Sequence, residues 1–155
     1  QIAPRWKNAA AILLILLVII DFYPGAYTEF APVEAREVDT WLLSQAGDGA
    51  VVQMPFSIAE DQEHTYYTLV HGKPYVGGFF NAFPPAQYKS VKPILENFPD
   101  ENSTRLLREL DVRWVLVDPA YYMDWGQTKR LIESFGFEMQ AQPGGMAVFS
   151  VQVEK

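Results

Sequence analysis

The chain has 155 residues, which is enough for one domain with a hydrophobic core. Its formal net charge is −7 and its lysines and arginines are scattered, so it lacks the basic stripe that a nucleic-acid partner would need. Because the chain contains no cysteine, a disulfide framework and a thiolate metal site are both excluded.

An unbroken apolar run without a polar face, residues 9–20, lies near the N-terminus. A helix of that length spans roughly 18 Å, which is less than the ~30 Å hydrocarbon core of a bilayer, whereas the wider stretch 1–22 comes close to spanning it. The run therefore predicts a transmembrane or anchor helix over residues 1–22. A signal-peptide core and a helix buried in the domain are the alternatives.

Charges on the two sides of the run predict its orientation. Arg5 and Lys7 precede it, whereas the charged residues between the run and Arg36, beginning with Asp21, are all acidic. By the positive-inside rule, the N-terminus would be cytoplasmic and residues 21–155 would lie on the extracytoplasmic side of the cell membrane.

The first half of the domain shows alternating helix and strand signals. Residues 23–32 hold two prolines and a glycine and predict a connector. A helix is expected over 33–46, because Val38, Trp41 and Leu42 share one face. The other expected elements are a strand at "AVVQMP", a helix over 58–70, a short strand over 75–77 and a helix over 85–97.

The second half contains the strongest strand signal, "VRWVLVDP", whose continuous apolar run suits a strand covered on both faces. A helix opened by Asn102 precedes it, and a helix ended by Gly136 follows it. "FEMQAQ" and "MAVFSVQV" flank a Pro-Gly-Gly turn and predict an antiparallel hairpin. Residues 33–155 should thus form an α/β domain, with a small mixed sheet of about four or five strands flanked by helices.

The stretch "HTYYTLVHGKPYVGGF", residues 64–79, gathers the residue types that bind ligands. His71 and Lys73 could hold a phosphate, although basic residues at a helix end also act as partners of the helix dipole. Tyr67 and Tyr75 could form a platform for a sugar or lipid headgroup, or could be half-buried with their hydroxyl groups bonded within the protein. Gly-Gly allows a close backbone approach or a tight turn.

A metal site is a weaker interpretation of the same stretch. Glu60, His64 and His71 would line one helix face, but Gly72 should end the helix and a fourth ligand is not evident. No metal site is therefore predicted.

Asp118 follows the strongest strand, at the end where ligands bind to parallel sheets. Aspartate before proline is also an ordinary way to open a turn. The candidate ligand-binding residues are His71, Lys73, Tyr75, Tyr67 and Asp118.

No complete catalytic signature occurs in the chain. It lacks the nucleophile elbow, the P-loop, the dinucleotide fingerprint and the zinc-protease motif. Ser57, Ser90 and Ser150 have no obvious local base, which disfavours a small hydrolase. We expect a chain that is not catalytic by itself and needs no cofactor.

Four blocks taken in order carry a family resemblance: "DFYPG", "GAVVQMPF", "YYTLVHGKPYVGGFF" and "PILENFPDENSTRLLRELDVRWVLVD". From residue 9 to about 150, the chain resembles the C-terminal end of bacterial polytopic membrane proteins of the GT-C glycosyltransferase type. It departs from the pattern at Gly77-Gly78-Phe79, where Asn-Gly-Tyr is usual, and at Asp111 and Trp114, which replace Gly and Tyr. The first departure puts a polar ligand contact at that turn in doubt.

The resemblance implies that the catalytic carboxylate and the sugar-carrier site belong to regions outside this chain. The chain would be an exported accessory domain of a lipid-carrier-dependent glycosyltransferase-like membrane protein. Its implied partners are membrane lipid, a polyprenyl-phosphate-linked sugar or glycan acceptor, and the remainder of the membrane protein. The alternative is a stand-alone membrane-anchored module that binds an envelope ligand along His71, Lys73 and Tyr75.

Overall fold

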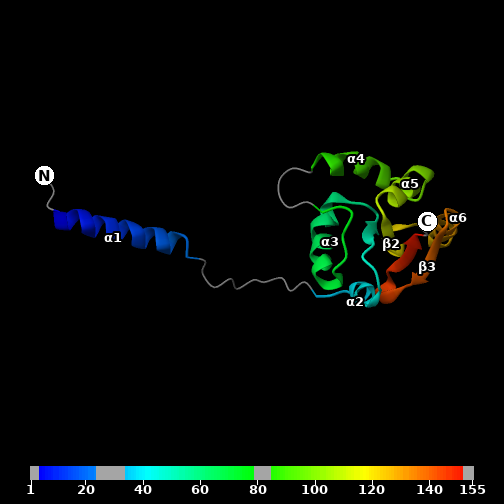
Figure 1. The fold of residues 1–155 in the computed structure, drawn as a ribbon, viewed down its shortest axis with the longest axis horizontal. Helices are drawn as coiled ribbons and strands as arrows, with labels where there is room; N and C mark the ends of the chain where they lie inside the picture. Colours follow the sequence, from blue (N-terminus) through cyan, green and yellow to red (C-terminus); the bar gives the residue numbers. More distant parts are fainter. Residues whose placement is uncertain (1–3, 24–33, 79–84, 152–155) are drawn as a thin grey trace. The chain divides into compact units, whose positions relative to one another are not determined.

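The computed structural model describes residues 4–23, 34–78 and 85–151, and the chain divides into two compact units, residues 1–32 and 33–155 (Figure 1). The first unit holds one helix, α1 (Pro4–Asp21), whose Ile, Leu and Val side chains from residue 12 to residue 20 are all exposed. No helix in the described part of the chain combines the length and the apolarity needed to cross a membrane. α1 lies within the stretch 1–22, but the hydrophobic membrane helix expected there is not shown, and a role for α1 in a membrane stays a prediction.

The second unit is built on a four-stranded mixed sheet with the strand order β1-β2-β4-β3. Its strands are β1 (Ala50–Met54), β2 (Val112–Val117), β3 (Phe137–Ala141) and β4 (Ala147–Val151). β1 and β2 run parallel, whereas β4 pairs antiparallel with both β2 and β3. The predicted mixed sheet and its C-terminal hairpin are thus confirmed, and the continuous apolar run of β2 occupies an interior position.

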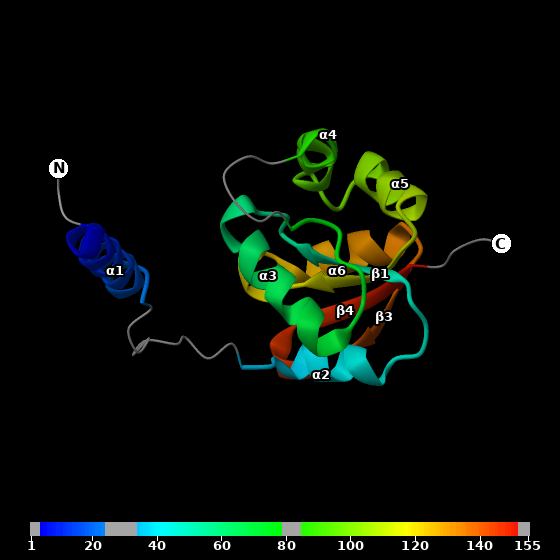
Figure 2. The ribbon, with the colours of Figure 1, turned by 60° about the vertical axis from the view of Figure 1, so that its left-hand side comes forward.

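Five helices and two short 3-10 turns surround this sheet in the described residues. They are α2 (Glu37–Ser44), α3 (Ile58–His71), α4 (Ala86–Leu95), α5 (Glu101–Glu109), η1 (Pro119–Tyr121), α6 (Trp125–Ser134) and η2 (Pro143–Gly145). Figure 2 shows α4 and α5 on one side of the sheet and α2 on the other. The connector expected over residues 23–32 lies almost entirely outside the described residues.

Two hydrophobic clusters lie on the two faces of the sheet. The larger joins Val52, Val115 and Phe149 of the strands to buried side chains of α4, α5 and α6. The smaller joins Val38 and Leu42 of α2 to the opposite face of the strands. Successive apolar side chains along each strand point to opposite faces, so the sheet has a core on both sides, as the apolar pattern of β2 predicted.

Several element boundaries differ by a few residues from the sequence prediction. α5 is capped by Asp100 rather than opened by Asn102, because Asp100 Oδ1 accepts from Ser103 N at 2.7 Å and Ser103 Oγ accepts from Asp100 N at 3.0 Å. α2 begins at Glu37 and ends at Ser44, inside the predicted range of 33–46.

Residues 75–77 do not form the expected strand. Tyr75 instead makes a single parallel bridge to Val51, in which Val51 N donates to Pro74 O and Val76 N donates to Val51 O, each at 2.8 Å. Gly77 and Gly78 then adopt φ values of +127° and +74°, which turn the chain away from β1. This short pairing at the edge of β1 positions the candidate site.

Candidate functional site

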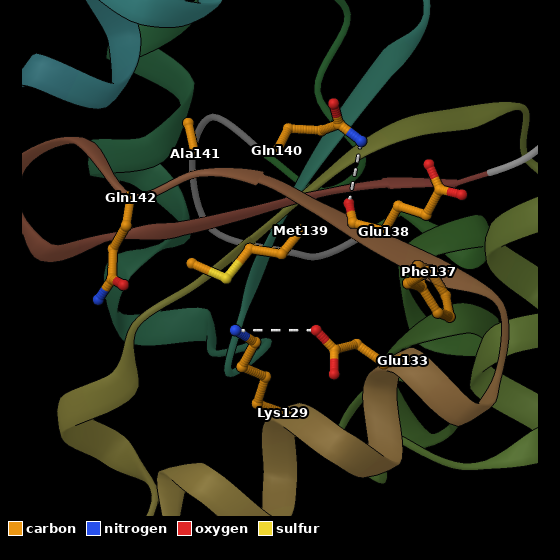
Figure 3. A pocket seen from close by; sticks show the side chains of 8 residues that line it. All are labelled: Lys129, Glu133, Phe137, Glu138, Met139, Gln140, Ala141 and Gln142. Carbon is orange, nitrogen blue, oxygen red and sulfur yellow. Dashed lines mark hydrogen bonds and ion pairs between the residues drawn. The ribbon is translucent and has the colours of Figure 1, made fainter.

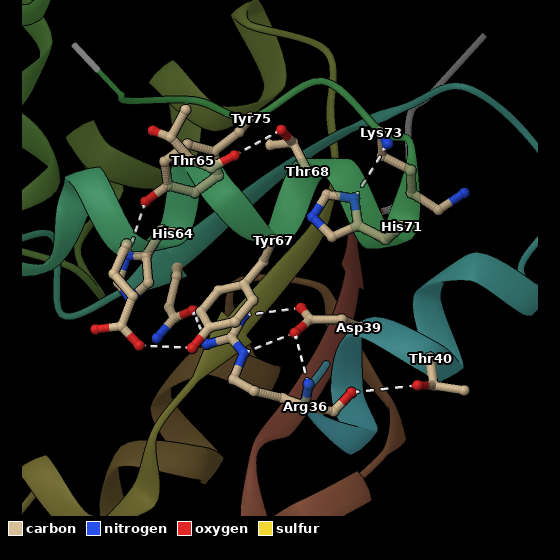
Figure 4. Close-up of polar contacts among 12 residues, drawn as sticks. Arg36, Asp39, Thr40, His64, Thr65, Tyr67, Thr68, His71, Lys73 and Tyr75 are labelled. Atoms are coloured by element: carbon tan, nitrogen blue, oxygen red, sulfur yellow. Dashed lines mark hydrogen bonds and ion pairs between the residues drawn. The ribbon is translucent and has the colours of Figure 1, made fainter. Parts of the chain in front are cut away.

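The buried face of α3 is polar, which is unusual for a helix that packs against a domain. Asp61, His64, Tyr67 and His71 recur every three or four residues and are all buried, whereas Leu69 is 83% exposed. Figure 4 shows Tyr67 directed toward Arg36, next to α2, and His64 and His71 near the turn that follows α3. Because buried polar groups are costly without partners, the bonds that satisfy them define the site.

Arg36 organises the first group of contacts, between α2 and α3 (Figure 4). Its Nε and Nη2 donate to the two carboxylate oxygens of Asp39 at 2.8 Å each, and its Nη1 donates to Gln53 Oε1 at 2.8 Å. The guanidinium also lies 3.7 Å from the centre of the Tyr67 ring. Burial, together with a hydrogen bond to Glu63, raises the pKa of Tyr67 to about 12. Tyr67 is therefore a neutral packing partner of Arg36.

Lys73 and His71 both serve the internal structure of the domain. Lys73 Nζ donates to the carbonyl oxygens of Gln45 and Gly47, each at 2.9 Å, just after α2 ends. His71 Nδ1 accepts from Lys73 N at 3.1 Å. Burial lowers the pKa of His71, although the Asp39 carboxylate opposes this effect. The ammonium and the imidazole thus fix the turn after α3 against the end of α2.

Tyr75 connects the turn to the first half of α3. Its hydroxyl group lies 3.1 Å from His64 Nδ1 and is also hydrogen-bonded to the Asp61 carboxyl group. Asp61 Oδ2 accepts from Gly78 N at 2.6 Å. Burial raises the pKa of Asp61, against the lowering effect of the bonds from Gly78 and Tyr75, and burial also raises the pKa of Tyr75.

The Gly-Gly pair allows this close approach. A Cβ atom on Gly77 would lie 2.4 Å from Asp61 Oδ1, and a Cβ atom on Gly78 would lie 2.5 Å from Thr65 Oγ1. Both residues also have positive φ, so a side chain at either position meets backbone strain as well as a steric clash.

The turn and α3 together line an open pocket of about 360 Å³, which we call the α3–turn pocket. It is lined by Thr65, Thr68, Gly72, Lys73, Pro74, Tyr75, Gly77 and Gly78. Of the residues proposed from the sequence, Lys73 and Tyr75 line this pocket, whereas Tyr67 and His71 support α3 and the turn without lining it.

Asp118 does not join this group. Its backbone N–H donates to Met54 O at the carboxyl end of β1, and its Oδ1 accepts from Ala120 N at 2.9 Å. Lys73 instead bonds to carbonyl groups that precede the first residue of β1. Since β1 has five residues and a strand rises about 3.3 Å per residue, the two side chains lie at opposite ends of the parallel strands.

A larger and more open pocket, of about 700 Å³, lies between α6 and β3 (Figure 3). Its polar groups include Lys129 and Glu133, whose Nζ and Oε1 atoms are 3.8 Å apart and whose side chains are about 40% exposed. None of the residues proposed from the sequence lines it. Within the described residues, no group of histidine, aspartate and glutamate is arranged to hold a metal ion; the side chain of Glu60 lies outside those residues.

Sequence reasoning did not single out Arg36, Asp39 or Asp61. A signal for Asp61 was present, because it precedes His64 by three residues and His71 by ten and so belongs to the same helix face. Arg36 and Asp39 carried no comparable signal, since charged residues at the start of a helix are normally solvated.

No protein-family profile matches the chain, and no curated protein matches it. Among solved structures, the chain is similar to the C-terminal globular domain of an oligosaccharyltransferase from Archaeoglobus fulgidus. The sequence identity is 15%, the match covers 75% of this chain and 95% of that chain, and the TM-score is 0.45. A likeness of this degree carries no argument about what the chain does.

Proposed function

We propose that the chain is an exported accessory domain, with its anchor helix, of a lipid-carrier-dependent glycosyltransferase-like membrane protein, and that it binds a glycan ligand in the α3–turn pocket. One observation carries this proposal. The block "YYTLVHGKPYVGGFF", which contributes to the resemblance to GT-C proteins, supplies most of the walls of that pocket. The residues of this block that line the pocket support a binding role for it.

The chemistry of the pocket favours binding over catalysis. Its two threonine hydroxyl groups donate to carbonyl groups of α3, and Lys73 Nζ donates to carbonyl groups beside α2. A catalytic nucleophile needs an adjacent base that is free to take its proton. The threonines and the lysine are held by structural bonds instead, which suits an accessory domain that positions a ligand for chemistry performed elsewhere in the membrane protein.

The proposed location is the extracytoplasmic side of the cell membrane, with α1 as the anchor. The exposed apolar side chains of α1 and the basic residues that precede them favour this arrangement. Ser90, which is exposed on α4, provides a test, because the chain has no cysteine of its own. A Ser90→Cys variant should react with a membrane-impermeant maleimide in intact cells, to a greater extent than the parent protein. Labelling only after cell lysis would contradict an external location.

The function is tested in the complete protein that contains this chain, in its own cells. Gly78→Ala places a methyl group against Thr65 and should reduce the glycan product of the membrane protein at equal protein level. Gly145→Ala is the matched control, because Gly145 also has positive φ but lies in η2 with open space around it. An unchanged amount of product with Gly78→Ala would rule out the accessory role. Ligand binding without any effect on product would favour the stand-alone binding module.

A further inference from the structure

We infer that the α3–turn pocket takes the uncharged, hydroxyl-rich part of a glycan and rejects its phosphate. This inference rests on the proposed function, because it names the chemical class of ligand for the same pocket. It follows from the threonine hydroxyl oxygens on the pocket wall and from the bonds that already hold Lys73, the cation among the described lining residues.

Five donors on the pocket wall are bonded within the protein. Their bonds run from Thr65 Oγ1 to Asp61 O (2.9 Å), from Thr68 Oγ1 to Thr65 O (2.6 Å), from Gly72 N to Thr68 O (2.8 Å), from Lys73 N to His71 Nδ1 (3.1 Å) and from Gly78 N to Asp61 Oδ2 (2.6 Å). Pro74 has no N–H group at all. These five donors are therefore not available to a ligand.

The two hydroxyl oxygens keep this accepting capacity after donating their own protons. A hydroxyl group has one donor and two acceptor lone pairs, so Thr65 and Thr68 can each accept from a ligand. A sugar supplies several O–H donors that match such acceptors. A phosphate group brings mainly acceptor oxygens, which would face other acceptors here.

The charges around the pocket also disfavour an anion. Anions bind where a cation or a set of free backbone N–H groups points at them. The Lys73 ammonium donates to two carbonyl groups at the end of α2, and the lysine is only 6% exposed. The Asp61 carboxyl group is buried behind the Gly-Gly backbone, where it accepts from Gly78 N. A phosphate in the pocket would therefore find the Lys73 ammonium already bonded to two carbonyl groups and a carboxyl group close behind the glycine backbone.

The size and the remaining surface of the pocket agree with a sugar ring. Its volume of about 360 Å³ lies at the small end of the range of ligand pockets, about 300–1,000 Å³. Pro74 and Tyr75 contribute apolar surface beside the glycine backbone, and the Tyr75 hydroxyl group is held away by His64. A ring with an apolar C–H face and polar edges fits such a mixed wall.

Nuclear magnetic resonance of the full chain in detergent micelles tests the inference. The backbone amides of Gly72, Gly77 and Gly78 report directly on the pocket. Methyl glucoside or N-acetylglucosamine should shift these three signals in a saturable way, whereas inorganic phosphate and diphosphate at the same concentration should not. Saturable shifts with phosphate and none with the sugars would overturn the inference, and so would no shift with any of these probes.

A pair of variants separates specific binding from general effects on the domain. Thr68→Val removes one acceptor and keeps the branched shape, and should weaken sugar binding about fivefold, as expected for the loss of one hydrogen bond. Thr128→Val is the matched control, because Thr128 Oγ1 makes the same kind of bond to Asp124 O on α6, away from the pocket. Equal affinities for the two variants would contradict the assigned contact. A sugar that binds while the glycan product in cells is insensitive to Gly78→Ala would leave this inference standing and remove the proposed function.

Discussion

The two sides of the sheet bury different chemistry. The side covered by α4, α5 and α6, which we call the apolar side, encloses the larger cluster of aliphatic and aromatic residues. The side formed by α2 and α3, the polar side, has a smaller apolar cluster and buries Arg36–Asp39 contacts, His71 and Lys73 as well. Hydrophobic burial stabilises the fold without fixing particular atoms, whereas charged hydrogen bonds cost desolvation but are directional. The apolar side thus holds the domain together, and the polar side positions the α3–turn pocket.

The largest expected loss of stability comes from a substitution on the apolar side. Phe149 is fully buried in the larger cluster, so Phe149→Ala should lower the free energy of unfolding by about 3–5 kcal/mol through lost burial and a residual cavity. Urea unfolding followed by circular dichroism measures this change. Met123→Ala is the control, because Met123 is fully exposed and its loss should cost less than about 0.5 kcal/mol. Similar losses for the two variants would show that this cluster does not dominate stability.

The second effect tests the polar side. Asp39→Ala leaves the Arg36 guanidinium without its bidentate partner and should cost about 2–3 kcal/mol, somewhat below the figure for a fully buried pair because Arg36 is partly exposed. Replacing both residues, as Arg36→Met with Asp39→Leu, should recover much of this loss, since both charges are then removed. If the double variant were less stable than Asp39→Ala, the pair would be stabilising in its own right.

A smaller effect separates steric fit from backbone strain beside the pocket. Gly145→Ala should lower the free energy of unfolding by about 1–2 kcal/mol, because positive φ disfavours alanine. Since nothing lies close to the added methyl group, this loss measures backbone strain alone. Gly78→Ala carries the same strain and also forces Thr65 to move, so its unfolding free energy should fall further. Equal losses in thermal or urea unfolding would mean that the contact between Gly78 and α3 is loose.

The pH dependence of stability is expected to come from the polar side. Burial lowers the pKa of His71 in the folded state below its ordinary value, so the unfolded chain binds the proton more tightly. The contribution of His71 to stability is therefore complete above the unfolded pKa of about 6.5 and is lost as pH falls through the lowered folded pKa. His71→Asn keeps an acceptor for Lys73 N and should flatten this acid-side loss in urea unfolding between pH 7.5 and 5. If the variant showed the same dependence of unfolding free energy on pH as the parent protein, His71 would be excluded as the source of the acid-side loss.

The smallest effect concerns the open pocket beside β3. Lys129 and Glu133 are about 40% exposed and 3.8 Å apart, so Glu133→Gln should change the unfolding free energy by less than about 0.5 kcal/mol. A loss above about 1 kcal/mol would show that this second pocket is also organised by its charges, and the contrast with the polar side would weaken.

The local parts of the fold were predictable, and the contacts of the site were not. β2 and the hairpin of β3 and β4 follow from apolar runs, alternation and a Pro-Gly-Gly turn, all within a few residues. Lys73 instead bonds to carbonyl groups 26 and 28 residues earlier, and Arg36 bonds to Gln53, 17 residues later. No periodicity encodes such pairs. The sequence indicated the pocket segment through its residue types, but not that His71 and Tyr67 would support the pocket without lining it.

The ammonium group of Lys73 connects one wall of the pocket to the residues that follow α2. Any displacement of that wall by an incoming molecule must either carry Gln45 and Gly47 along or break two charge-assisted bonds. Binding of a ligand would then displace the backbone of the residues that lead into β1, which are distant in sequence from the pocket wall.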